Sequence, residues 1–133
     1  MRLLKQIAVA AVAELKIVEA EIEINLVSAE KMAEINWQFL KHEGSTDVIT
    51  FDYSRSNLSG EIFICIDDAI AQAKRFKTSW QSEIARYLVH GILHLAGYDD
   101  LRADLRRKMK REENASMRAL SKRFSLAEIS RPS

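Results

Sequence analysis

The chain has 133 residues, 47% of them hydrophobic and 29% charged, which is an ordinary composition for a globular protein. A chain of this length is expected to form one domain with its own hydrophobic core. Its 20 basic and 19 acidic residues leave a formal net charge of +1, so overall charge gives no case for a nucleic-acid-binding protein, and any basic surface must come from local clustering.

Periodic apolar residues predict, in chain order, a helix over 3–15, a strand over 21–27, a helix from 29 to about 39, a loop over 40–46, and strands over 47–51 and 61–66. Ser28 is placed to cap the second helix, whose apolar residues are Met32, Ile35 and Phe39. The polar segment between the two later strands carries Gly60 and fits a loop or a hairpin connection.

The second half is predicted to be helical, with a short helix from Asp67 or Asp68 to about Phe76, a long helix over 80–96 opened by a capping box at Thr78, and a last helix over 101–120. Gly97 is placed to end the long helix in the left-handed conformation. We expect the tail from about residue 125 to be flexible. Together these elements predict an α+β fold, a single domain over 1–133 with a small mixed sheet packed against helices.

Cys65 is the only cysteine, and its apolar surroundings predict a buried, reduced side chain. No disulfide can form within one chain, which suits a reducing compartment. The first helix is interrupted by Lys5 and Glu14, so we interpret it as amphipathic rather than as a signal peptide. Since no stretch reaches the roughly 20 apolar residues that span a bilayer, we expect a cytoplasmic protein without a membrane partner.

The run HGILHLAGYDD at residues 90–100 carries the strongest functional signal. His90 and His94 are four residues apart in a predicted helix, so their rings project from one face, roughly 6 Å apart, and can bind one ion. Gly97 lets the chain turn back, so that Asp100, or alternatively Asp99, can supply a third ligand. This predicts a metal site at the end of the central helix. Three protein ligands leave one position open, as in catalytic zinc sites.

The spacing also excludes one class of zinc enzyme. Zincin proteases need a glutamate directly after the first histidine of H-E-x-x-H, where it acts as the general base. Gly91 occupies that position here, so peptide hydrolysis by this mechanism lacks its base. Glu83 and Arg86 lie more than one helical turn before His90, and we interpret them as surface or supporting groups.

These residues resemble the YbeY family of bacterial metal-dependent endoribonucleases, whose signature is H-G-x-L-H-L-x-G-Y-D-H. The resemblance extends over roughly 20–115 and includes the block TDVITF at 46–51, Gly60-Glu61-Ile62, and Asn36. It implies that His90, His94 and Asp100 hold zinc, with Asp100 standing where the family has a third histidine. Two histidines and one carboxylate also suit other divalent ions, including iron.

The resemblance implies a single-strand-specific endoribonuclease that takes part in rRNA maturation, at the three-prime end of small-subunit rRNA, and in ribosome quality control. The implied partners are rRNA and the ribosome or small-subunit assembly proteins, and no DNA is expected. Two alternatives remain. One is a metal-binding ribosome assembly factor with little nuclease activity, and the other is a different metal-dependent hydrolase.

Two further positions are candidates for catalysis, one suggested by this resemblance and the other by the predicted packing of a strand. The family carries an arginine four residues after the asparagine, where this chain has Leu40, so Lys41 or His42 is expected to supply the cation instead. Thr50 is expected to present its hydroxyl to the site, provided that its strand lies against the metal-binding helix.

A basic stripe follows the predicted metal site. Arg102, Arg106 and Lys110 share one face of the last predicted helix, and we expect this face to contact RNA phosphates. Binding through such contacts should weaken steeply with salt. A solvated helix face is the alternative explanation, because Glu112 and Glu113 follow directly.

Overall fold

The computed structural model describes residues 2–54 and 57–130. In chain order the elements are α1 (Arg2–Glu14), β1 (Ala20–Val27), α2 (Ala29–Ile35), the π-helix η1 (Asn36–Leu40), β2 (Val48–Asp52), β3 (Leu58–Cys65), α3 (Ile66–Phe76), α4 (Trp80–Leu95), α5 (Ala103–Arg123) and the 3-10 helix η2 (Leu126–Glu128). Every predicted helix and strand is present, with its ends shifted by a few residues at most.

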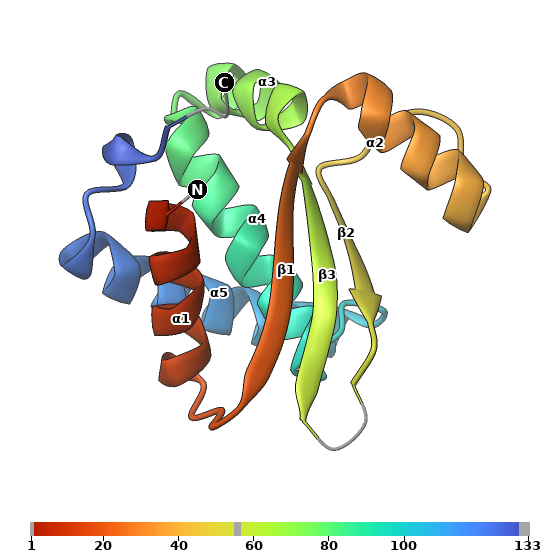
Figure 1. The fold of residues 1–133 in the computed structure, drawn as a ribbon. Coiled ribbons are helices and arrows are strands. Elements are labelled where there is room, and N and C mark those ends of the chain that lie inside the picture. The colour runs from red at the N-terminus through yellow and green to blue at the C-terminus, as the bar shows by residue number, and fades with distance from the viewer. Residues whose placement is uncertain (1, 55–56, 131–133) are drawn as a thin grey trace.

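The strands form one mixed sheet with the order β1-β3-β2. The central strand β3 pairs in parallel with β1, where Ile24 lies opposite Ile62, and antiparallel with β2, where Thr50 lies opposite the same Ile62. Helix α4 packs against β2 and β3 and also against α1, α3 and α5, as Figure 1 shows. This arrangement confirms the α+β fold, with a small mixed sheet covered by helices around a central one.

Helix α4 lies close against the sheet because a glycine faces the strands. A Cβ atom added at Gly91 would lie 3.1 Å from side-chain carbons of Ile62 and Thr50, which is tighter than ordinary packing. The neighbouring turns of α4 bury Leu88 and Ile92 completely. The glycine therefore fixes how closely the helix that carries His90 approaches the sheet.

The predicted starts of two helices are wrong. Helix α4 is capped by Ser79, whose Oγ accepts a hydrogen bond from the Ser82 amide at 3.1 Å, whereas Thr78 Oγ1 donates to the carboxylate of Glu83. Helix α3 begins at Ile66, so Asp67 lies inside its first turn. There its carboxylate accepts from the Ala29 amide at 2.7 Å. The Thr78 hydroxyl and the Asp67 carboxylate therefore have hydrogen-bond partners that the local sequence does not indicate.

The second helix also departs from the prediction in its last turn. It changes to a π-helix at Asn36, which places Phe39 on the surface, 59% exposed. A π-turn adds a residue to each hydrogen-bonded ring, so the side chains that follow are rotated away from the face set by Met32 and Ile35. Asn36 itself is buried, and its amide donates to the Gly44 carbonyl at 3.0 Å.

The sequence predicts a flexible tail from about residue 125. In the structure, the described residues of this segment are ordered up to residue 130. Helix η2 follows, and Ile129 is only 3% exposed within the hydrophobic core. Residues 131–133 lie outside the described part. Burial of the Ile129 side chain explains why the segment is ordered. Cys65, as predicted, is buried and not in a disulfide.

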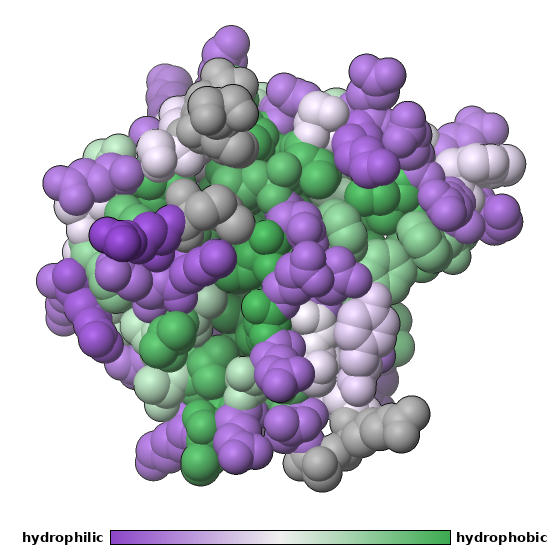
Figure 2. Space-filling model, viewed as in Figure 1, coloured by the Kyte–Doolittle hydropathy of each residue, from purple (hydrophilic) through white to green (hydrophobic). Residues whose placement is uncertain are grey.

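None of the described helices is long and apolar enough to cross a membrane. The face of the molecule shown in Figure 2 carries hydrophobic residues in a band down the middle, with hydrophilic side chains on both sides.

Candidate metal centre and adjoining cleft

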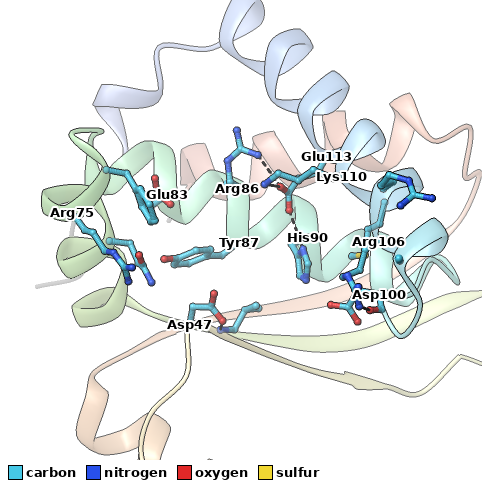
Figure 3. A pocket seen from close by; sticks show the side chains of 16 residues that line it. Asp47, Arg75, Glu83, Arg86, Tyr87, His90, Asp100, Arg106, Lys110 and Glu113 are labelled. Atoms are coloured by element: carbon cyan, nitrogen blue, oxygen red, sulfur yellow. Dashed lines mark hydrogen bonds and ion pairs between the residues drawn. The ribbon is translucent and has the colours of Figure 1, made fainter.

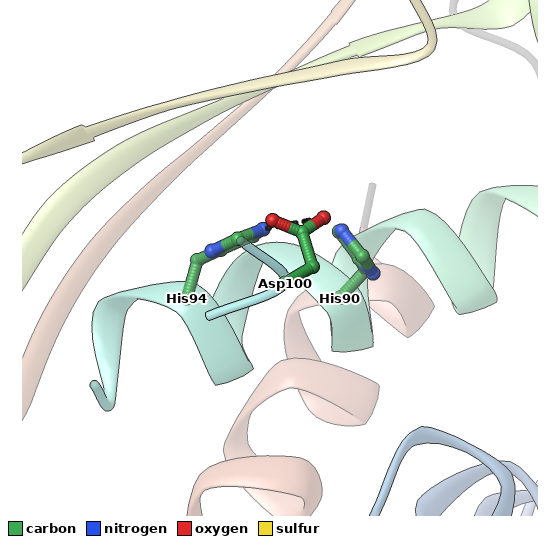
Figure 4. A group of neighbouring side chains, drawn as sticks. All are labelled: His90, His94 and Asp100. Atoms are coloured by element: carbon green, nitrogen blue, oxygen red, sulfur yellow. Dashed lines mark ion pairs between the residues drawn. The ribbon is translucent and has the colours of Figure 1, made fainter. Parts of the chain in front are cut away.

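The two histidines and the aspartate of the predicted site lie together at the end of α4. Their ligand atoms, one each from His90, His94 and Asp100, all lie within 4.8 Å of one another. Figure 4 shows the Asp100 carboxylate close to both imidazole rings, with His94 Nε2 4.0 Å from Asp100 Oδ2. Ligand atoms that each lie ~2.0–2.1 Å from a tetrahedral zinc ion are about 3.4 Å apart. Small side-chain rotations therefore bring this cluster to the geometry of a metal site.

Asp100 reaches the histidines because the chain reverses direction after α4. Gly97 adopts a φ of 103°, and its amide donates to the His94 carbonyl at 3.1 Å, so the helix ends in the predicted left-handed turn. Asp99, the alternative third ligand, instead accepts a hydrogen bond from the Leu101 amide. The geometry therefore favours Asp100 over Asp99.

A buried carboxylate, Glu113 of α5, holds one of the histidine rings. Its Oε1 lies 2.9 Å from His90 Nδ1, and its Oε2 accepts from Arg86 at 2.7 Å and from Lys110 at 2.9 Å. Burial acts to raise the pKa of Glu113, but the hydrogen bonds from His90, Lys110 and Arg86 outweigh it and lower this pKa to about 2. The carboxylate is therefore ionised at neutral pH.

The ionised state of Glu113 decides which nitrogen of His90 can bind a metal. A carboxylate is only an acceptor, so His90 Nδ1 must carry the proton in their hydrogen bond. This leaves the lone pair on Nε2 available, as in the carboxylate–histidine–metal arrangements of many zinc proteins. The interpretation of Arg86 as a supporting group is consistent with this network, because Arg86 contacts the carboxylate rather than the cluster itself.

His94 is also held in the form that binds metal ions. Burial, and secondarily the neighbouring His90, lower the pKa of His94 below its ordinary value, although Asp100 acts in the opposite direction. A lower pKa favours the neutral imidazole, which is the ligand form. The lowered pKa of His94 therefore favours metal binding by this residue.

Two members of the cluster, His90 and Asp100, line a cleft of about 870 Å³ between α3, α4, α5 and the start of β2. Figure 3 shows Arg75 and Glu83 toward one end of the cleft and Asp100 and Arg106 toward the other. We call one the metal end, which comprises His90, Asp100, Arg106, Arg107 and Lys110. We call the other the α3 end, which comprises Asp47, Gln72, Arg75, Phe76, Glu83 and Tyr87.

The predicted RNA-binding residues are divided by the structure. Arg106 and Lys110 line the metal end of the cleft, together with Arg107, which was not among the predicted contacts. Arg106 also donates to the Asp100 carbonyl at 3.2 Å, and Lys110 is engaged by Glu113. Arg102 precedes α5 and pairs with Asp104 at 3.4 Å, outside the residues that line the cleft.

The two predicted catalytic residues lie in different places. Strand β2 does lie against α4, as the prediction for Thr50 required, and the Thr50 methyl group packs against Gly91, between the two histidines. Lys41 ends η1 with a left-handed φ of 56°, and its Nζ lies 5.6 Å from the centre of the Trp37 ring. Neither residue is among the described residues that line the cleft.

Glu113 is the functional residue that the sequence reasoning missed. It was interpreted as part of the charge that follows the basic stripe, yet it is only 4% exposed. Its position did carry a signal, because it falls four residues after Met109 and four before Met117, on the apolar face of α5. A single carboxylate on an otherwise apolar helix face indicates a buried partner, here 23 residues away along the chain.

Comparison with known proteins places this geometry in a family. The family model described as "Endoribonuclease YbeY" matches residues 1–121. A protein of that name from Parabacteroides distasonis is 40% identical over 101 residues, which cover 75% of this chain and 71% of that protein. Another from Bacteroides fragilis is 40% identical over 111 residues, covering 83% and 78% respectively. The solution structure of a protein from Thermotoga maritima matches with a TM-score of 0.73 and 28% identity, covering 92% of this chain and 81% of that one.

Proposed function

The chain belongs to the YbeY endoribonuclease family, and on this premise we propose that it is a metal-dependent endoribonuclease that cleaves single-stranded RNA. The observation that carries the proposal is the His90, His94 and Asp100 cluster at one end of a cleft lined with arginine and lysine. A phosphodiester placed there has ligands for a metal ion on one side and cations on the other.

The residues present fit a zinc ion. Two imidazoles and a carboxylate are a common zinc ligand set, and Glu113 supports His90 as a second layer of contacts does in zinc proteins. When bound, such an ion acts as a Lewis acid on a phosphate oxygen or makes water a better nucleophile. Another divalent transition metal is the alternative, because the same ligand set also suits iron.

The chain's own residues would position the substrate. Arg106 and Arg107 present cations at the metal end of the cleft, where they can hold a phosphate and balance the charge that develops on it during cleavage. They are better placed for this than Lys41, which remains a candidate only if RNA extends toward η1. Thr50, beside Gly91, remains the candidate for a hydroxyl near the histidines.

We further propose that the substrate in the cell is rRNA and that the protein acts in the cytoplasm. The family premise favours processing of the three-prime end of small-subunit rRNA and ribosome quality control, with the ribosome or small-subunit assembly proteins as partners. Unpaired RNA fits the cleft better than a duplex does, because its bases can be splayed apart.

The test compares wild-type protein with His94→Ala, both analysed for metal content and then incubated with unstructured and base-paired RNA of equal length. We expect the wild type to bind about one zinc ion and to cleave the unstructured RNA, and the variant to do neither. Asp99→Asn is the matched control, because Asp99 lies next to the site and its carboxylate accepts a hydrogen bond from the Leu101 amide.

Two results would contradict the proposal. If His94→Ala kept its zinc and its cleavage activity, the cluster would not be the active site. If the wild type bound zinc and failed to cleave any RNA, the assembly-factor alternative would replace the endoribonuclease.

A further inference from the structure

The α3 end of the cleft contains two polar atoms without partners. Tyr87 is only 6% exposed, and neither its hydroxyl nor the Oε1 atom of Gln72 has a hydrogen-bond partner among the described residues. Both residues line the cleft. Buried polar groups are nearly always paired, because leaving one unpaired costs stability. Both atoms are buried in the wall of the cleft, so a ligand that supplies the missing partners would reach them after a small rotation of each side chain.

An aromatic side chain lies at the same end. Phe76, the last residue of α3, lines the cleft and is 59% exposed, and the Arg75 guanidinium lies 5.3 Å from the centre of its ring. An exposed aromatic ring beside an arginine is a common platform for an unstacked nucleobase. The position of Phe76 on α3 brings that platform to the same part of the cleft as Gln72.

The α3 end carries two carboxylates against the single guanidinium of Arg75, so its charge disfavours phosphate. Asp47 and Glu83 line the cleft there, and Figure 3 shows them on either side of Tyr87. Their carboxylates repel a phosphate but accept hydrogen bonds from the amino groups of bases. Burial above all, and the charges of Asp47 and Glu83, raise the pKa of Tyr87. Its hydroxyl therefore stays protonated and can donate to a ring nitrogen.

We propose that the α3 end of the cleft is a subsite for one unstacked nucleobase, stacked on Phe76 and hydrogen-bonded along its Watson–Crick edge by Gln72 and Tyr87. This subsite rests on the proposed RNA substrate, and it adds a preference for particular nucleobases. Because Gln72 Oε1 and the two carboxylates are acceptors, a base with an exocyclic amino group, such as cytosine, fits better than uracil.

The subsite lies within reach of the metal cluster. Tyr87 precedes His90 by three residues on α4, a rise of about 4.5 Å along the helix. A phosphate held by Arg106 at the metal end therefore leaves its neighbouring base next to Tyr87. The side chain of Gln72 is half-buried, and we expect it to change rotamer when the base enters.

The experiment measures binding of fluorescent single-stranded oligomers of one length by wild-type protein, with EDTA present to prevent cleavage. The oligomers are oligo-cytidylate, oligo-uridylate and an abasic ribose-phosphate chain, so the result does not depend on the register of binding. We expect oligo-cytidylate to bind on the order of tenfold more tightly than the abasic chain, and a few-fold more tightly than oligo-uridylate.

Three variants assign the effect to the subsite. Phe76→Ala should remove most of the difference between oligo-cytidylate and the abasic chain, and Gln72→Met and Tyr87→Phe should each narrow the preference for cytosine over uracil. Phe39→Ala is the matched control, because Phe39 is equally exposed at 59% and does not line the cleft. Loss of the exposed Phe76 ring leaves the core intact, so a folding defect does not obscure that variant.

The outcomes separate this proposal from the proposed function. If wild-type protein cleaves RNA with zinc but binds the abasic chain as tightly as oligo-cytidylate, the subsite is overturned and the endoribonuclease stands. If Phe76→Ala binds oligo-cytidylate as tightly as Phe39→Ala does, the subsite is likewise overturned. Base-dependent binding lost in Phe76→Ala, without cleavage by the wild type, supports the subsite and contradicts the endoribonuclease.

Discussion

The proposed metal site draws its residues from two regions that differ in how firmly they are held. His90 and His94 stand on α4, which packs against two strands, three α-helices and the 3-10 helix η2, and has Leu88 and Ile92 fully buried in the same turns. Asp100 stands on the segment between α4 and α5, where its side chain is 45% exposed. Two features hold that segment in place. They are the left-handed turn at Gly97, which precedes Asp100, and the hydrogen bond from Arg106 to the Asp100 carbonyl.

This difference indicates how much each region contributes to the metal affinity of the proposed site. The helix prepares two imidazoles before any cation arrives, so little conformational freedom is lost when they bind it. The carboxylate on the exposed segment must be brought in and held, which costs part of its binding free energy. We therefore expect metal affinity to depend most on α4 and its supports, and less on Asp100.

Removing a helix ligand is expected to have the largest effect. His94→Ala should lose metal retention entirely, whereas Asp100→Ala should weaken zinc affinity on the order of 100-fold and leave binding detectable. Competition with a chelating dye measures both. If Asp100→Ala lost as much affinity as His94→Ala, the two regions would contribute equally and the comparison would fail. Asp99→Ala controls for a change of charge in the segment.

Changing the support of a helix ligand should have a smaller effect. Glu113→Gln keeps the size of the side chain but no longer offers His90 Nδ1 a charged acceptor, and such second-layer changes cost about 10–100-fold in metal affinity. Glu112→Gln, one residue away and without this contact, is the matched control. Equal zinc affinities for the two variants would mean that Glu113 does not position His90.

Glu113 also predicts a dependence of stability on pH. Its pKa of about 2 lies below its ordinary value of 4.5, so the ionised group stabilises the fold above pH 4.5, and this contribution is lost as the pH falls toward 2. The shift corresponds to about 3 kcal/mol. The measurement is urea unfolding of metal-free protein in EDTA at pH 6 and at pH 3. Between these two pH values, the free energy of unfolding should fall more in the wild type than in Glu113→Gln. The same loss in both proteins would contradict the assignment.

The smallest effect is expected from the contact that fixes the exposed segment. Arg106→Ala removes a hydrogen bond to a backbone carbonyl at the surface, so zinc affinity should fall by no more than about fivefold. RNA affinity should fall further. The slope of log affinity against log salt concentration should become shallower by an amount that corresponds to about one released counterion. Unchanged salt dependence would show that Arg106 does not contact phosphate.

The fold and the metal cluster were accessible from sequence because their signals are local. Alternation in β1, the period of α4 and the glycine at its end are each contained within one segment, and the spacing of His90 and His94 places both rings on one face. Even the turn toward Asp100 depends only on Gly97 and its neighbours. Where the chemistry of a site follows the period of one helix, the sequence is enough to predict it.

The features that were missed depend on partners far along the chain. Glu113 meets His90 from another helix, and Ile129 is ordered only because the core accepts its side chain. Ser79 rather than Thr78 caps α4, because the Thr78 hydroxyl donates its hydrogen bond to Glu83. The π-turn at Asn36 moved Phe39 to the surface without any periodic signal. Each of these needs the packed structure before it can be seen.

Gly91 has a consequence for the evolution of this site. The sequence is one substitution away from the H-E-x-x-H pattern of a zincin, yet the direction of a side chain at this position leads into Ile62 and Thr50. A glutamate there would have to displace the sheet before it could serve as a base. Hence the fit of a helix to a sheet separates this chain from peptidase chemistry, and we expect mutation of this codon alone to damage the fold rather than to yield a new activity.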